Sequence, residues 1–167
     1  FGSAEGYHRR VADMVASGVI LDEGMVYFDA RLSRRYPTVE IRVADVCLHA
    51  RTAVLIALLA RGLVETAARE WRAGRAPVDH SVSLLRLASW QAARTGLSGE
   101  LLHPATMRRL PAKNVVEGLL RHVEEALAES GDLERARAGC AALLDGGTGA
   151  QLQRELLERT ACLRGGV

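Results

Sequence analysis

Two short segments near the start of the chain alternate between apolar and polar residues. In Met25–Arg31, the apolar positions are 26, 28 and 30, and in Thr38–Ala44 they are 39, 41 and 43. Successive side chains of a strand point to opposite faces of a sheet, so this period of two predicts two β-strands. The connector, Leu32–Pro37, is polar and ends in proline. The sequence therefore predicts an antiparallel β-hairpin.

The other segments have the apolar spacing of helices. A first helix is expected around Tyr7 and Val11, ending near Gly18. After Asp45 we expect helices only, separated by loops that contain glycine or proline: residues 51–72, 81–95, a helix opened by Pro111 and closed by Gly131, 133–144 and 150–163. The fold class is therefore α+β, with a β-hairpin packed on a mainly helical C-terminal region. We expect one folded portion, in which residues 1–48 form the first helix and hairpin and residues 49–167 form the helical region.

Composition narrows the classes of partner. The 167 residues carry 22 basic and 20 acidic side chains, and a net charge of +2 leaves no strong excess for binding a nucleic acid or a membrane surface. The longest apolar run, Ala53–Ala60, is far shorter than the roughly 20 residues that span a bilayer. Cys47, Cys140 and Cys162 are too scattered for a disulfide framework. We expect them to be small buried residues in the reducing cytoplasm.

The hairpin carries the candidate functional residues. Alternation predicts that its apolar face packs on the long helix 51–72, and that the opposite face presents four charged residues: Asp29, Arg31, Glu40 and Arg42. Carboxylate oxygens suit Mg²⁺, and guanidinium groups match phosphate oxygens. Such a face could bind a divalent cation and a phosphate. The alternative is a solvated surface with cross-strand ion pairs.

Two later features each have two interpretations. Trp90 and Arg94 lie one helical turn apart, and they either form a stacked cation–π pair or pack one helix on another; packing is the preferred interpretation. Residues 146–149 are rich in glycine but lack the Lys-Ser/Thr of a phosphate-binding P-loop. We therefore expect a helix boundary there, although a role near a nucleotide stays open.

The stretch Gly24–Cys47 resembles a family signature. It reads GMVYFDARLSRRYPTVEIRVADVC. This is similar to the W-D-x-R-P-S strand and P-T-[VI]-E-[IL]-R-[VI]-x-D strand of the glutamate–cysteine ligase family, bacterial carboxylate–amine ligase type. The similarity continues through residues 63–74, 90–97 and 147–154 and covers nearly the whole chain. Phe28 and Leu32 stand where the family usually has Trp and Pro, substitutions that packing and the turn can absorb.

The resemblance implies a glutamine-synthetase-like sheet that binds ATP and Mg²⁺. In that family a substrate carboxylate is phosphorylated, and an amine then displaces phosphate to form an amide. By position, Glu40 would be the metal ligand and Arg42 a phosphate contact. Asp29 and Arg31 would line the same site, where Arg31 and Arg42 would be catalytic. Asp45 would either support this site or cap the helix that follows.

The resemblance also implies that part of the ligase is missing. Family members begin with a strand bearing a G-x-E-x-E-like motif, which this sequence does not contain. We therefore expect the C-terminal part of a ligase, with the N-terminal part supplied in cis or in trans, acting on an amino-acid carboxylate and an amine. The alternative is a non-catalytic helical module whose hairpin pairs with another chain. The sequence leaves the two substrates undetermined and a homo-oligomer open.

Overall fold

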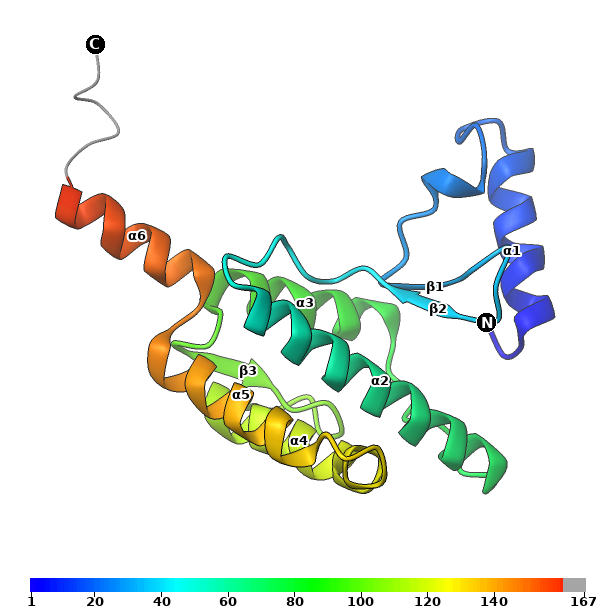
Figure 1. Ribbon diagram of the computed structural model, residues 1–167. Helices are drawn as coiled ribbons and strands as arrows, with labels where there is room; N and C mark the ends of the chain where they lie inside the picture. Colours follow the sequence, from blue (N-terminus) through cyan, green and yellow to red (C-terminus); the bar gives the residue numbers. More distant parts are fainter. Residues whose placement is uncertain (161–167) are drawn as a thin grey trace, which may run out of the picture. The chain divides into compact units, whose positions relative to one another are not determined.

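The computed structural model describes residues 1–160 and divides the chain into two compact units. The N-terminal unit is Phe1–Val46, and the C-terminal unit begins at Cys47. Both contain helices and one antiparallel pair of short strands, so the fold class is α+β as predicted (Figure 1). Each unit is described by itself below.

Helix α1 (Ala4–Ala16) opens the N-terminal unit. Its N-cap is Ser3, whose hydroxyl accepts a hydrogen bond of 3.0 Å from the Gly6 amide. The C-cap of the helix is Ser17, and Gly18 follows at φ +71°, the left-handed conformation that glycine adopts without strain. The sequence predicted this helix and its glycine stop.

The predicted hairpin is present, with shorter strands. Strands β1 (Ala30–Leu32) and β2 (Val39–Ile41) pair antiparallel. The amide of Arg42 also donates to the Asp29 carbonyl at 2.8 Å, which continues the ladder beyond the strands. The chain before β1 forms a single 3₁₀ turn, η1 (Glu23–Met25), where Asp22 Oδ1 accepts from the Gly24 amide at 2.7 Å.

The core of the N-terminal unit corrects one sequence expectation. Val26 is buried with Tyr7 and Val11 of α1, and Phe28 and Leu32 pack on the same cluster. The apolar side of the first strand segment therefore packs on α1, a helix to which the sequence analysis had not assigned it. The sequence pattern identified the apolar face but carried no information on which of two amphipathic helices would cover it. Packing of Val39, Ile41 and Val43 on that long helix stays a prediction.

Three helices form the core of the C-terminal unit: α2 (Ala50–Arg72), α4 (Ala112–Glu129) and α5 (Leu133–Gly146). Each of the three helices contacts the other two. The buried residues between them are Leu55, Val123, Leu127, Ala136 and Cys140. Two further helices, α3 (Val82–Thr95) and α6 (Gly149–Thr160), complete the helical set within the described residues. All five were predicted to within a few residues at their described ends; the part of the last predicted helix beyond residue 160 lies outside the described residues.

A second hairpin contradicts the expectation that only helices follow Asp45. Strands β3 (Glu100–Leu102) and β4 (Arg109–Pro111) pair antiparallel, and β3 also contacts α3. Three-residue strands give too little alternation to be recognised in a sequence. The turn between them is closed by backbone hydrogen bonds, including one of 2.9 Å from the His103 amide to the Arg108 carbonyl. Local turn bonding and packing on α3 thus decide the structure here.

Three further sequence expectations concern the start of α2, the burial of the cysteines and the apolar length of the helices. The N-cap of α2 is His49, so the capping alternative for Asp45 is wrong. Cys140 is buried as expected, whereas Cys47 is only partly buried and corrects that expectation; Cys162 lies outside the described residues. Along residues 1–160, none of the helices combines the length and apolar character needed to cross a bilayer.

Candidate functional site

The register of the first hairpin determines which side chains share a face. Arg31 lies directly opposite Glu40, and Ala30 lies opposite Ile41. Opposite residues in an antiparallel pair point to the same side, and neighbours along a strand point to opposite sides. Arg31 and Glu40 therefore share one face with the next pair on that side, Asp29 and Arg42, which the backbone bond from Arg42 to Asp29 aligns. The predicted charged face is thus supported by the register.

Three of these four side chains form a connected ion cluster. The Nε atom of Arg31 donates to Glu40 Oε2 at 2.5 Å, and Arg42 Nε lies 3.5 Å from Glu40 Oε1. Glu40 is therefore a single carboxylate held between two guanidinium groups. Arg31 also donates from Nη1 to the Gly24 carbonyl at 3.5 Å. Because the Arg31 side chain is only 24% exposed, it is the best fixed of the three.

An aromatic residue belongs to the same face, and the sequence interpretation had omitted it. The guanidinium carbon of Arg42 lies 5.3 Å from the centre of the Tyr27 ring. This is within the range of a cation–π interaction, which orients the guanidinium plane. The signal was available, because Tyr27 alternates with Val26 and Phe28 and so falls on the polar side.

The cluster can contribute to a metal site without completing one. Within residues 1–160, no group of three or more His, Cys, Asp or Glu side chains is arranged to hold a metal ion. Mg²⁺ in nucleotide sites is commonly held by one or two carboxylates together with phosphate oxygens and water. Glu40, with Asp29 on the same face, fits that smaller requirement. Arg31 and Arg42 beside it are suited to phosphate oxygens.

The structure also describes the two other features that the sequence left with two interpretations, the Trp90–Arg94 pair and the glycine-rich residues 146–149. Arg94 lies over the ring of the exposed Trp90, with its guanidinium carbon 5.5 Å from the ring centre, so the pair is stacked and the packing interpretation is wrong. Residues 146–149 form the boundary between α5 and α6, as expected. There the Gln151 side chain accepts from the Thr148 amide at 2.7 Å, which caps the start of α6.

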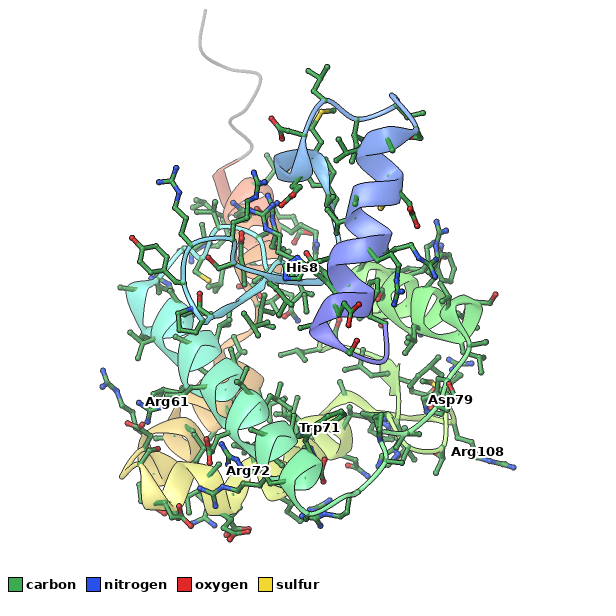
Figure 2. The ribbon with its side chains drawn as sticks, turned by 90° about the vertical axis from the view of Figure 1, so that its right-hand side faces the viewer. His8, Arg61, Trp71, Arg72, Asp79 and Arg108 are labelled. Carbon is green, nitrogen blue, oxygen red and sulfur yellow. The ribbon has the colours of Figure 1, made fainter. Side chains whose placement is uncertain are left out.

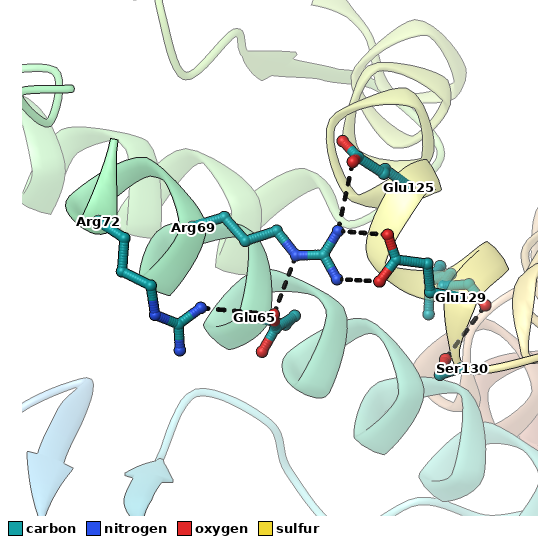
Figure 3. A network of polar contacts seen from close by, with 7 residues as sticks. Glu65, Arg69, Arg72, Glu125, Glu129 and Ser130 are labelled. Atoms are coloured by element: carbon teal, nitrogen blue, oxygen red, sulfur yellow. Dashed lines mark hydrogen bonds and ion pairs between the residues drawn. The ribbon is translucent and has the colours of Figure 1, made fainter. Parts of the chain in front are cut away.

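A second polar network joins α2 and α4 in the C-terminal unit (Figure 3). Arg69 donates to both carboxylate oxygens of Glu129, at 2.9 and 2.5 Å, and to Glu65 at 2.9 Å. Glu125 lies 3.4 Å from the same guanidinium group. The bonds from Arg69 lower the pKa of Glu129, and hydrogen bonds to Glu129 and Glu65 raise the pKa of Arg69. The network connects a guanidinium group of α2 to carboxylates of α4, so it is a structural link between two packed helices.

Comparison with known proteins supplies the family. The family model described as glutamate-cysteine ligase family 2 (GCS2) matches residues 1–167. A protein of Streptomyces avermitilis named "Putative glutamate--cysteine ligase 2-1" is 75% identical over 98% of this chain and 45% of its own length. "Putative glutamate--cysteine ligase 2" of Streptomyces coelicolor is 71% identical over the same shares, and a Paenarthrobacter aurescens protein, "Putative glutamate--cysteine ligase 2-1", is 52% identical over 95% of the chain and 41% of its own length. The chain thus spans less than half the length of these relatives. With a match along its whole length, the chain belongs to glutamate–cysteine ligase family 2.

Proposed function

We propose that this chain is the C-terminal part of an ATP- and Mg²⁺-dependent carboxylate–amine ligase that joins glutamate to cysteine. A substrate carboxylate would take a phosphoryl group from ATP, and the amine would then displace phosphate to leave an amide. Membership of the family supports this reaction class. The observation that carries the proposal is the cluster of Glu40 between Arg31 and Arg42 on one hairpin face.

Each residue of the cluster has a role in this proposal. Glu40 would hold Mg²⁺, with Asp29 as a second carboxylate on the same face. The chemistry that Mg²⁺ would supply there is neutralisation of the negative charge on the phosphate groups. Arg42 and Arg31 bind the phosphoryl group that moves, because a planar guanidinium can donate two parallel hydrogen bonds to it. Tyr27 keeps the guanidinium of Arg42 in place through the stacked contact.

The ion pairs do not prevent such binding. Glu40 is 45% exposed and Arg42 is 35% exposed. Ion pairs between exposed side chains typically stabilise by roughly 0–1 kcal/mol. A phosphate that takes over the donors of Arg31 and Arg42 replaces these exposed ion pairs with charge-assisted bonds of the same kind, so the exchange costs little. The cluster is therefore a set of preassembled charges that can change partners.

The proposal requires more protein than this chain contains. Its relatives are more than twice as long, and we expect their additional length to supply further carboxylates for the metal. That part would be joined in cis or supplied in trans, and the two units described here would form one portion of the complete ligase domain. ATP-dependent synthesis agrees with the cytoplasmic location expected from the scattered cysteines.

The test is turnover of ATP by the full-length protein. We expect Glu40→Gln, which removes the charge, and Arg42→Lys, which removes the planar fork, each to lower ADP formation with glutamate and cysteine by at least about a hundredfold. Matched controls exist in the C-terminal unit, where Glu124 pairs with Arg137 at 2.5 Å and is 46% exposed. Glu124→Gln changes a carboxylate as exposed as Glu40, and Arg137→Lys changes an ion-paired arginine somewhat more exposed than Arg42; both should keep turnover within about twofold.

The outcomes separate the enzyme from a non-catalytic module. Loss of turnover in the two hairpin variants alone, at unchanged melting temperature, supports the assigned roles. Normal turnover in Glu40→Gln or Arg42→Lys would return the hairpin to a solvated, ion-paired surface. If the unmodified full-length protein forms no ADP with any pair of amino acid and amine, the ligase proposal itself is wrong and the binding-module alternative gains.

A further inference from the structure

A small open pocket lies beside the charged face of the hairpin, within the N-terminal unit. It has a volume of about 190 Å³ and is formed by α1, η1, β1, β2 and the turn after β1. Its charged and aromatic lining consists of Tyr7, His8, Glu23, Arg31, Arg34 and Glu40. His8 lies on α1 (Figure 2). Pockets for drug-sized ligands usually measure about 300–1,000 Å³, so this one suits a smaller molecule.

Charges of both signs line this pocket in equal pairs. Arg34 Nε lies 3.0 Å from Glu23 Oε2, and Arg31 lies 2.5 Å from Glu40. A simple anion would match the arginines and leave two carboxylates facing it, and a simple cation would do the reverse. A ligand with one positive and one negative group on neighbouring atoms can satisfy both members of a pair at once. The α-ammonium and α-carboxylate groups of an amino acid have this arrangement.

The two ion pairs of the pocket differ in whether the proposed phosphate and Mg²⁺ site already uses them. Arg31 and Glu40 belong to the cluster assigned to phosphate and Mg²⁺, whereas Glu23 and Arg34 have no part in that cluster. The Arg34 side chain is 76% exposed, so its ion pair is weak and easily exchanged for a ligand. The pocket shares Arg31 and Glu40 with the charged face, and a molecule held by Glu23 and Arg34 would therefore sit next to the phosphate-binding groups.

We propose that this pocket is the binding site for the zwitterionic end of one amino-acid substrate, with Arg34 binding its α-carboxylate and Glu23 its α-ammonium group. This inference rests on the proposed function for its biological meaning, but its physical basis is the pocket itself. Glu23 and Arg34 are then specificity-determining residues: they select an α-amino acid and take no part in phosphoryl transfer.

The test is binding of L-glutamate and L-cysteine to the full-length protein by isothermal titration calorimetry, without ATP. Glu23→Gln and Arg34→Gln should each weaken binding of one of these amino acids by about tenfold or more, because each removes a charge-assisted hydrogen bond. Arg35→Gln is the matched control, since this neighbouring arginine does not line the pocket. The Arg35→Gln variant should bind each amino acid with the affinity of the unmodified protein.

Analogues that lack one charge give a second, independent reading. Glutarate and 3-mercaptopropionate are the two amino acids without the ammonium group. The analogue of the bound substrate should bind the unmodified protein about tenfold or more weakly than the amino acid does. Replacing Glu23 by Gln should not weaken the analogue further. The comparison of amino acid with analogue on the unmodified protein tests by itself whether binding needs the ammonium group. It therefore does not depend on whether a variant folds correctly.

Failure of this inference and failure of the ligase proposal give different results. Unchanged amino-acid affinity in both variants, equal binding of analogue and amino acid, or no binding of either amino acid overturns the pocket assignment. In those cases Glu40→Gln can still abolish turnover and leave the ligase standing. Conversely, selective amino-acid binding that depends on Glu23 and Arg34 in a protein without ATP turnover supports the pocket and rejects the ligase reaction.

Discussion

Gly62 is a site where a single methyl group should destabilise the C-terminal unit. It lies in the middle of α2, where a Cβ atom would come within 3.1 Å of Val123 Cβ and 3.3 Å of Leu127 Cγ on α4. Both neighbours are fully buried, and Val123 Cβ is attached directly to the backbone, so neither can swing away. Gly62→Ala therefore forces the two helices apart by a few tenths of an ångström.

The expected change in the free energy of unfolding on Gly62→Ala is the sum of two opposing effects. Replacing glycine by alanine inside a helix stabilises by about 1 kcal/mol through backbone entropy. Inserting a methyl group into a well-packed core typically costs about 1–3 kcal/mol. We therefore expect Gly62→Ala to lower the free energy of unfolding by about 0–2 kcal/mol. Gly118→Ala in α4 is the matched control, because its Cβ would meet only the end of the Arg121 side chain, at 3.9 Å.

The assay is urea unfolding of the protein, followed by the helical circular dichroism signal. Gly118→Ala should be stabilised by up to about 1 kcal/mol, so the two variants should differ by about 1–3 kcal/mol. The same difference should separate their melting temperatures by a few degrees. Equal stability of the two alanine variants would refute the reasoning, because it would mean that α2 and α4 are not in close contact at Gly62.

Two further predictions concern titratable groups. Bonding to Arg69 lowers the pKa of Glu129, so the stabilisation from this pair should be complete at neutral pH and should be lost as the pH falls below the ordinary glutamate pKa and through the depressed one. Unfolding midpoints of the unmodified protein and of Glu129→Gln, measured from neutral to acid pH, should therefore converge at low pH; a constant gap would contradict this. Burial raises the pKa of the Cys140 thiol, which keeps it protonated and shielded. Iodoacetamide should therefore modify the partly exposed Cys47 before Cys140, as peptide mass analysis would detect. Faster modification of Cys140 would show that α5 does not cover it as described.

Local patterns in the sequence were sufficient to predict most of the elements. Ser81 accepts from the Leu84 amide at the start of α3, and Gly96 ends this helix at φ +55°. Both residues are recognisable as helix ends because their chemistry acts within a few residues. The second hairpin could not be predicted because its strands are too short to show alternation. Its strands pair across the turn that follows His103, and β3 also packs on α3, so contacts between elements stabilise residues whose own pattern is uninformative.

In the candidate site too, the sequence pattern predicted some features and could not predict others. Alternation placed Arg31, Glu40 and Arg42 on one face, and the register supports that placement. Alternation could not predict that both arginines would pair with the same carboxylate, because side-chain rotamers decide this. It also could not predict the Glu23–Arg34 pair, whose members lie in a 3₁₀ turn and a hairpin connector. Irregular segments carry no periodic signal, yet they form much of the pocket.

The small core of the N-terminal unit explains why the charged face is oriented at all. Three-residue strands have a weakly determined register, and a slip of one residue would turn every charged side chain to the other side. Val26 is 1% exposed, locked among side chains of α1, and it lies only a few residues before β1. Because side chains alternate from this anchor, Val26 and Phe28 on the apolar side require Tyr27, Asp29 and Arg31 on the other. Burial of Val26 against α1 therefore sets the direction in which Arg31 points, and the ion pair with Glu40 opposes a slip of the second strand.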